Sequence, residues 1–166
     1  MSDYGFPFHS IEELYRFGAD QPFPLPAPGD AAALSAPVRG AGFTLPNALA
    51  IQPMEGCDAD ERGAPTELTY RRYRRYGGSG AGLIWAEAIA VSADSRANPR
   101  QLMITPDNVA AFSDLIGQTR AAARDAGFPA PVIIAQLTHS GRFSKPGGQL
   151  APLRGCANAT MDAHQR

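Results

Sequence analysis

The chain has 166 residues, of which 44% are hydrophobic and 19% are charged, and these values fit one globular domain. A formal net charge of −1 gives no electrostatic reason to expect nucleic acid or an acidic membrane surface as a partner. No apolar run approaches the ~20 residues of a membrane-spanning helix, and the first residues show no secretory signal. With only Cys57 and Cys156, a disulfide framework and a four-cysteine metal site are excluded, so we expect a cytoplasmic protein without a metal.

Residues 1–37 are interpreted as an N-terminal approach segment. Within it, Ile11–Phe17 could form one or two helical turns. The prolines of QPFPLPAPGD, residues 21–30, exclude a regular helix and a central strand. The patterned part of the sequence begins near Val38.

Three short apolar runs are interpreted as buried strands. They are Ala48–Pro53, Gly82–Glu87 and Val132–Leu137. Two helical patterns separate them, so the order is strand, helix, strand, helix, strand. Nearly unbroken apolar strands that alternate with helices are typical of a parallel sheet in an α/β fold.

The first helix is predicted to open at Pro65-Thr66-Glu67 and to stop at Gly77-Gly78, because proline suits a helix start and glycine a helix end. Its tyrosines recur every three residues and lie near one face. Its arginines are interpreted as a solvated surface rather than a nucleic-acid patch, because Glu67 is near and the net charge is negative. These residues are Tyr70, Tyr73 and Tyr76, and Arg71, Arg72, Arg74 and Arg75.

The second helix is predicted to begin at Thr105-Pro106, with Thr105 as N-cap and Pro106 in the first helical position. Gly127 suits the position just after its C-terminus. Spacings of three and four residues predict one buried face, made of Val109, Phe112, Leu115, Ile116, Thr119 and Ala123.

The glycine cluster Gly77–Gly82 does not have the context of a dinucleotide-binding loop. Such a loop follows a strand and opens a helix, whereas this cluster follows a helix and opens a strand. The element order alone leaves two architectures open, a doubly wound sheet and the start of a (β/α)₈ barrel.

Polar residues follow each predicted strand. Gln52–Gly56 come after the first strand, Glu87-Ala88 end the second, and Gln136 with Thr138–Arg142 end the third. In both architectures ligands bind at the carboxyl ends of the strands, so these residues predict a site. Glu87 is expected to pair with Arg96 or Arg142, because a partly buried carboxylate needs a partner.

Four segments together resemble the N-terminal part of the old yellow enzyme family, the FMN-dependent NADH:flavin oxidoreductases. They are NALAIQPMEG, GGSGAGLIWAEAIAV, SRANPRQL and IIAQLTHSGRFSKP, within residues 38–148. The resemblance implies a partial (β/α)₈ TIM barrel containing about the first three βα units. It also implies FMN as cofactor, NADH or NADPH as reductant, and an electron-poor alkene as substrate. The resemblance is also compatible with a homo-oligomer.

The resemblance also implies which residues contact FMN. In the family the loop after strand one passes beside the flavin ring, a small residue follows the strand-two glutamate, and the strand-three glutamine meets the pyrimidine edge. Many members have Cys or Thr where this chain has Glu55, with Cys57 two residues further on. The implied set is Gln52, Pro53, Met54, Glu55, Ala88 and Gln136.

Strand alternation supports the place of Gln136 in this set. Ile134 and Gln136 share one side of their strand and are expected to point into the barrel. Ala135 and Leu137 are expected to face the helices. The Gln136 amide has both donor and acceptor groups, which match the alternating N–H and C=O groups of the flavin edge.

The catalytic residues stay unknown, because in the family the substrate-binding His/His or His/Asn pair and the proton-donating Tyr lie on later strands. Residues 149–166 show no family pattern and no fourth strand, which favours a truncated or frame-shifted product that is inactive alone. Two alternatives are a non-catalytic barrel fragment that folds poorly or docks onto another chain, and a different flavin- or phosphate-binding barrel with local similarity only.

Overall fold

The computed structural model describes residues 7–22, 25, 29, 32–40 and 42–163. Their contacts divide the chain into two units, Met1–Ala32 and Ala33–Arg166. In the first unit, helix α1 (Ile11–Ala19) confirms the predicted helical turns, and Ser10 caps it by accepting a hydrogen bond from the backbone of Glu13. Most of residues 21–30, which were predicted to be irregular, lie outside the described residues.

A short helix and a hairpin lead into the patterned part of the second unit. Helix α2 (Ala32–Ser35) is followed by strands β1 (Val38–Gly40) and β2 (Phe43–Leu45), which pair antiparallel with Val38 opposite Leu45. The sequence analysis missed this hairpin, because strands of three residues are too short to show a periodic pattern.

The three predicted strands form one parallel sheet in the order β3-β4-β5. They are β3 (Ala50–Ile51), β4 (Leu83–Ala90) and β5 (Val132–Thr138). The first strand is shorter than predicted, and the second continues to Ala90, beyond its predicted end at Glu87.

Helix α3 (Glu67–Gly77) begins and ends where the sequence predicts, with Thr66 as N-cap. Its last residue approaches the neighbouring helix closely. A Cβ atom on Gly77 would lie 2.0 Å from the backbone oxygen of Thr119, so only glycine fits there.

Helix α4 (Val109–Asp125) begins three residues later than predicted. The Asn108 side chain accepts a hydrogen bond from the Thr105 backbone at 2.8 Å and donates one to the Met103 carbonyl at 2.8 Å. These bonds hold residues 105–108 in a turn, so Asn108 replaces Thr105 as the N-cap. The helix ends as predicted, and Gly127 adopts a φ of 80°.

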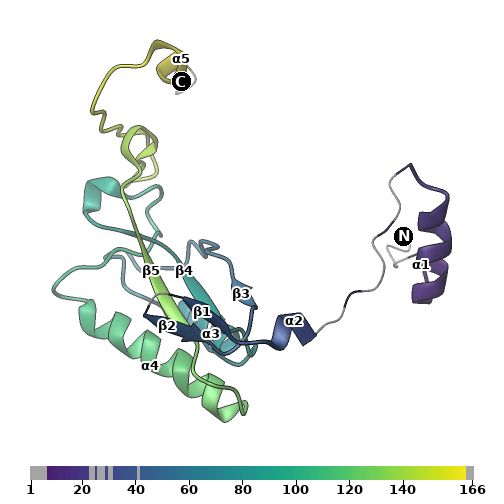
Figure 1. Ribbon diagram of the computed structural model, residues 1–166. Helices are drawn as coiled ribbons and strands as arrows, with labels where there is room; N and C mark the ends of the chain where they lie inside the picture. Colours follow the sequence, from purple (N-terminus) through teal and green to yellow (C-terminus); the bar gives the residue numbers. More distant parts are fainter. Residues whose placement is uncertain (1–6, 23–24, 26–28, 30–31, 41, 164–166) are drawn as a thin grey trace, which may run out of the picture. The chain divides into compact units, whose positions relative to one another are not determined.

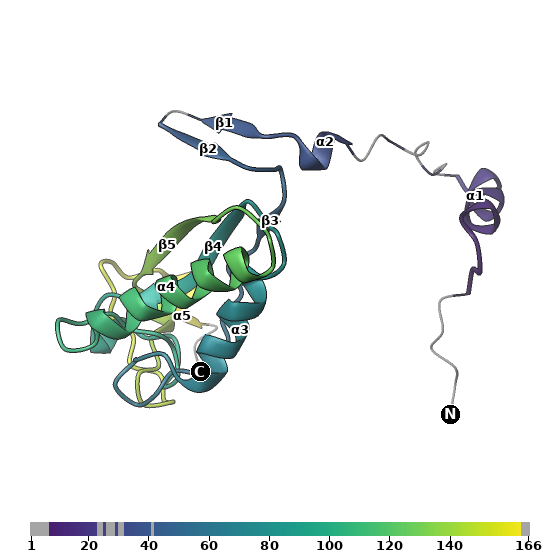
Figure 2. The same cartoon turned by 90° about the horizontal axis from the view of Figure 1, so that it is seen from below.

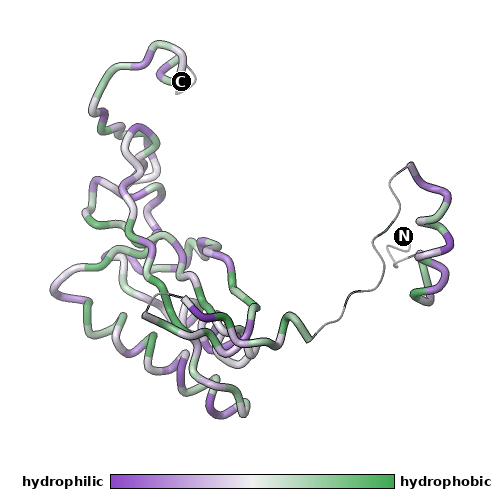
Figure 3. Tube along the Cα trace, in the orientation of Figure 1, coloured by the Kyte–Doolittle hydropathy of each residue, from purple (hydrophilic) through white to green (hydrophobic). Residues whose placement is uncertain are grey.

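Helices α3 and α4 cover the same face of the sheet (Figures 1 and 2). Apolar and polar stretches alternate along α4 (Figure 3), and its predicted face is buried at four of six positions. Val109 in the first turn is 51% exposed and Ile116 is 37% exposed, so the prediction is wrong there, because neither is fully covered by α3 or the sheet. The core between the layers contains Tyr73, Ile84, Ala86 and Leu115 in one cluster, and Ala59, Ile89, Leu102 and Phe112 in another.

The other face of the sheet has no helix over it among the described residues. Trp85 and Ile134, which are register partners, are 44% and 37% exposed there. A doubly wound sheet has helices on both faces, whereas a barrel wall has them outside only. The architecture is therefore a three-stranded parallel α/β sheet built like part of a barrel wall, and the described residues do not close a barrel.

The sides predicted for the residues of β5 are confirmed in part. Ile133 and Ala135 line a small apolar cavity of ≈ 80 Å³ with Phe112 and Leu115 of α4, so they face the helices. Leu137, which was also expected to face a helix, is 62% exposed, because no helix among the described residues covers it.

Short elements complete the second unit. Two 3₁₀ turns, Ala93–Ser95 and Gly141–Phe143, lie in the loops after β4 and β5. From Gln149 to Ala163 the structure contains only helix α5 (Ala159–Ala163) and no strand, as the sequence predicts. Among the described residues, no helix combines the length and the apolarity that a membrane crossing needs.

Candidate functional site

The loops at the carboxyl ends of the three strands are joined by backbone hydrogen bonds. Ser140, after β5, donates to the carbonyl of Ser95, after β4, at 2.9 Å. Ala59, after β3, donates to the carbonyl of Arg100, in the loop after β4, at 3.0 Å. The three strand ends therefore converge, as the sequence predicts.

Ala88 and Gln136 lie side by side at this edge. A β-bulge makes this possible, because Trp85 to Ala88 spans three residues while the facing Ile134 to Gln136 spans two. The Oε1 atom of Gln136 is buried and has no hydrogen-bond partner within the part of the chain that the structure describes. A buried amide oxygen without a donor costs stability, and such an atom is a good place for a ligand donor to bind.

Gln101 connects Glu55 to Ala88. Its Nε2 donates to Glu55 Oε1 at 3.3 Å and to the Ala88 carbonyl at 3.2 Å, and the residue is 2% exposed. Its own Oε1 accepts a hydrogen bond from Ala97 at 2.6 Å. Sequence reasoning missed Gln101, although it belongs to SRANPRQL, one of the segments on which the resemblance depends.

Gln52, Pro53 and Met54 lie in the loop after β3. Met54 is 69% exposed, and its backbone N–H donates to the Gln52 carbonyl at 2.9 Å. No hydrogen bond between described residues joins these three to Ala88 or Gln136. The structure thus links Glu55 to Ala88 through Gln101 and places Gln136 beside Ala88. Gln52, Pro53 and Met54 precede Glu55 in the same loop and have no such link among the described residues.

Glu55 and Cys57 share an environment that disfavours negative charge. Burial raises the pKa of Glu55, and the charge of Glu87 raises it further, while a hydrogen bond from Asn98 acts in the opposite direction. Burial, followed by the charge of Glu55, also raises the pKa of the Cys57 thiol. A raised pKa keeps Cys57 protonated, so this cysteine is a poor nucleophile.

Glu87 points toward α3 and pairs with Arg72, which corrects the expected partners Arg96 and Arg142. Arg72 Nη1 lies 2.7 Å from Glu87 Oε1, and the backbone N–H of Gly56 donates to Glu87 Oε2 at 2.8 Å. Glu87 is 3% exposed. Since the sequence placed Arg72 on a solvated face, that interpretation is wrong for this arginine.

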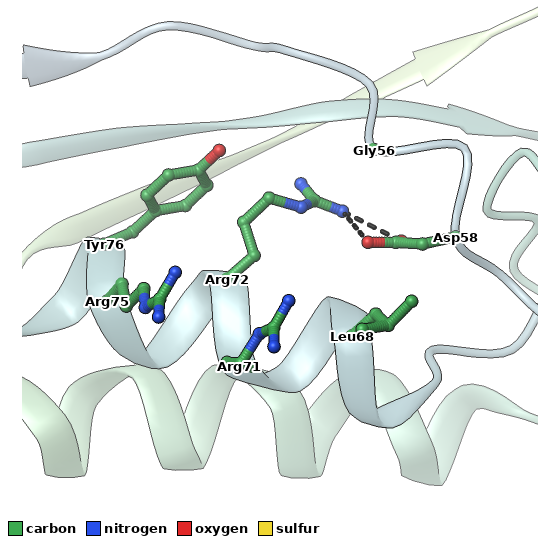
Figure 4. A pocket seen from close by; sticks show the side chains of 7 residues that line it. All are labelled: Gly56, Asp58, Leu68, Arg71, Arg72, Arg75 and Tyr76. Carbon is green, nitrogen blue, oxygen red and sulfur yellow. Dashed lines mark hydrogen bonds and ion pairs between the residues drawn. The ribbon is translucent and has the colours of Figure 1, made fainter.

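A second carboxylate completes the surroundings of Arg72. Its Nη2 bonds both oxygens of Asp58, at 2.9 and 3.0 Å (Figure 4). Burial alone would lower the pKa of Arg72, but the hydrogen bonds and charges of Glu87 and Asp58 raise it above its usual value. Burial and the charge of Glu87 also raise the pKa of Tyr73, whose hydroxyl accepts a bond from the Glu87 backbone at 3.2 Å.

The other candidate charges at the strand ends have structural partners. Arg96 is 5% exposed and donates to the carbonyls of Glu61 and Gln101, at 3.0 and 2.9 Å. Arg142 forms an ion pair with Asp162. His139 is exposed, and its Nδ1 accepts a hydrogen bond from Gly141 at 3.0 Å.

Comparison with known proteins identifies relatives by structure. No protein-family model and no curated sequence matches the chain. The old yellow enzyme homologue of Zymomonas mobilis is 30% identical with a TM-score of 0.55, over 71% of this chain and 32% of its own. The old yellow enzyme of Trypanosoma cruzi (26% identity, TM-score 0.54) covers 70% of this chain and 29% of its own.

Morphinone reductase gives a similar result. It is 26% identical with a TM-score of 0.52, over 68% of this chain and 28% of its own. A 2-naphthoyl-CoA reductase superimposes with a TM-score of 0.60 at 14% identity, which shows a shared fold alone. These neighbours are TIM-barrel oxidoreductases, and the chain spans about a third of the length of the first two.

Proposed function

Because the chain resembles the N-terminal part of the old yellow enzymes in sequence and in structure, we propose that its strand ends form part of an FMN site. The proposed parent activity is that of an NADH- or NADPH-dependent oxidoreductase acting on electron-poor alkenes. One structure of the similar morphinone reductase contains tetrahydroNAD, which supports a nicotinamide as reductant. Bound FMN would supply hydride transfer from the nicotinamide to the alkene.

The unpartnered amide oxygen of Gln136 carries this proposal. Its Oε1 is buried beside Ala88, on the face of the sheet that no helix covers. An amide can accept from one flavin N–H and donate to a neighbouring carbonyl, and the small Ala88 side chain leaves room for a flat ring. Trp85 and Ile134 add an exposed apolar surface on the same face.

The loop after β3 would supply the remaining contacts. Met54 presents an exposed apolar side chain, and Gln52 and Pro53 precede it in the same loop. Glu55 is held by Gln101 and by Asn98, whose Nδ2 lies 3.4 Å from Glu55 Oε2. Burial and then the charge of Glu87 raise its pKa, and both of its oxygens accept hydrogen bonds.

We propose further that these 166 residues alone do not reduce alkenes. In the family that the chain resembles, the substrate carbonyl is bound by residues of later strands. An assay for enone reduction with NADPH, FMN and the purified chain should show no turnover above the rate without protein. Steady turnover by the chain alone would contradict this proposal.

The FMN site is tested by titrating FMN with the chain and following quenching of flavin fluorescence. The Gln136→Leu variant keeps the size of the side chain and leaves flavin polar groups unpaired, so its affinity should fall by about 1–3 kcal/mol. The matched control is Leu137→Gln, one residue further on, which is 62% exposed and should leave both FMN binding and stability nearly unchanged. Equal affinity of Gln136→Leu and the parent chain would show that Gln136 does not contact flavin.

A second candidate function is that of a barrel fragment that docks onto another chain. The observation that favours it is the edge position of β5, together with the exposed Trp85, Ile134 and Leu137. Unpaired edges and exposed apolar surfaces promote association. A chain that is colourless with added FMN, and monodisperse only when co-expressed with a partner, would favour this candidate over the first.

A further inference from the structure

The four arginines of α3 differ in their partners. Arg72 pairs with Asp58 and Glu87, and Arg74 forms an ion pair with Glu67 and donates to Gln118 at 2.9 Å. Arg71 and Arg75 are exposed and take part in no ion pair with another described residue. They are four residues apart, so they lie on the same side of the helix.

Both unpaired arginines line a pocket of ≈ 450 Å³ between α3 and the loop after β3. Figure 4 shows their guanidinium groups rising from the helix on the side where Arg72 reaches Asp58, with Gly56 across from them. Leu68 and Tyr76, which precede and follow the arginines on α3, also line the pocket. The pocket thus combines cationic groups with apolar surface.

The pocket carries an excess of positive charge. Among the residues that the structure describes, Asp58 is the only acidic one that lines it, and both of its oxygens are bound by Arg72. The charges of Arg71 and Arg75 are therefore not neutralised by the lining. Like charges four residues apart destabilise a helix. The negative end of the helix dipole stabilises the charge of Arg75, which lies in the last turn of α3. Arg71 lies outside the last turn, so its charge is not stabilised in this way.

We propose that this pocket binds an organic phosphate monoester, with the phosphate between Arg71 and Arg75. Guanidinium groups recognise phosphate oxygens through paired N–H donors. Leu68, 48% exposed, and the ring of Tyr76 would contact the small apolar or aromatic group of the ligand. This site lies on the helix side of the sheet, and the proposal does not depend on the flavin site.

The test uses phenyl phosphate and inorganic phosphate as probes, in calorimetric titrations of the full chain at constant ionic strength. The double variant Arg71→Gln/Arg75→Gln should weaken binding of both probes at least about tenfold, because both charged donors are lost. Arg120→Gln, which removes an exposed arginine of α4 outside the pocket, should have no effect. Equal binding by the double variant and this control, or no binding by the parent chain, would overturn the proposal.

A second comparison tests the apolar part of the pocket. The parent chain should bind phenyl phosphate more tightly than inorganic phosphate, and Leu68→Ser should reduce this preference without weakening inorganic phosphate. Gln136→Leu should leave both probes unaffected, so that failure of this site and failure of the flavin site are distinguishable. A parent chain without preference for phenyl phosphate would refute a ligand with an apolar group.

Discussion

The two faces of the three-stranded sheet have the same kinds of residue and very different surroundings. On the face under α3 and α4, Ile84 is fully buried against Tyr73 and Leu115. On the opposite face its neighbour Trp85 is 44% exposed and faces Ile134, which is 37% exposed. Both faces are apolar, so the exposed one has the composition of the inner wall of a barrel, which needs further side chains or a ligand to cover it.

Polar groups show the same contrast. Glu87 turns toward α3 and receives a guanidinium and a backbone N–H. Gln136 lies on the uncovered face, and its buried Oε1 has no donor among the described residues. The buried carboxylate on the helix-covered side thus has a cation beside it, whereas the buried amide oxygen on the uncovered side has no such partner among the described residues. The predictions below test this difference, beginning with the largest expected effect.

Removing the cation of the covered side should destabilise the chain most. Arg72→Met leaves Glu87 buried and unpaired, so we expect the free energy of unfolding to fall by about 3–5 kcal/mol. The measurement is urea denaturation followed by circular dichroism. Arg72→Met/Glu87→Gln should recover part of the loss, and the exposed Arg75→Met is the matched control. If Arg72→Met lowers the free energy of unfolding no more than Arg75→Met does, the ion pair contributes little to stability.

Truncation of two neighbouring residues of β4 should lower the free energy of unfolding to very different extents. Ile84→Ala leaves a cavity under the helices and should cost about 2–5 kcal/mol in the free energy of unfolding. Trp85→Ala removes a larger side chain from the uncovered face, and its cost should stay below about 1 kcal/mol, as for surface positions. Thermal unfolding of both variants checks this. Comparable losses would show that Trp85 is covered in solution.

The sequence predicted the elements whose signals are local. Apolar runs of strand length between turn residues located β3, β4 and β5, and Gly127 marked the end of α4. The start of α4 could not be predicted from propensity, because Thr105-Pro106 is a good helix start in isolation. Two side-chain bonds of Asn108 decide the outcome instead.

The residues of the candidate site could also be predicted only in part. The polar residues at strand ends were found because parallel strands bring their carboxyl ends to one edge. The partner of Glu87 was not found, because Arg72 lies on a helix that precedes β4, and only the packing of α3 brings the two together. Gln101 was missed because a buried glutamine between loops has no spacing that distinguishes it from a surface residue.

The open edge of the sheet should also govern association. Strand β5 is at the edge of the sheet, and its apolar Ile134 and Leu137 are exposed, so we expect the chain to self-associate. Leu137→Lys places a charge at the edge and should shift the population toward the 17.6 kDa monomer without loss of helical signal. Light scattering over a range of concentrations measures this. A parent chain that is monomeric at every concentration would contradict the expectation.

The smallest expected effect concerns Glu55, which has two amide partners and, among the described residues, no ion pair with a cation. Burial first, and then the charge of Glu87, raise its pKa in the folded chain above the ordinary value of 4.5. Between 4.5 and the raised value, the folded chain binds more protons at Glu55 than the unfolded chain does. The contribution of Glu55 to stability is therefore complete below pH 4.5, and it is lost as the pH rises through the folded pKa.

Glu55→Gln cannot titrate, so the stability of the parent chain relative to this variant should increase as the pH falls from 7 toward 4.5. Because Glu55 is largely exposed, solvent screening keeps the change below about 1 kcal/mol. Urea denaturation of both chains at several pH values measures it, and Asp125→Asn, which removes an exposed carboxylate at the end of α4, is the control. A relative stability that falls on acidification would mean that Glu55 is better stabilised as a carboxylate, and that Asn98 and Gln101 outweigh burial and the charge of Glu87.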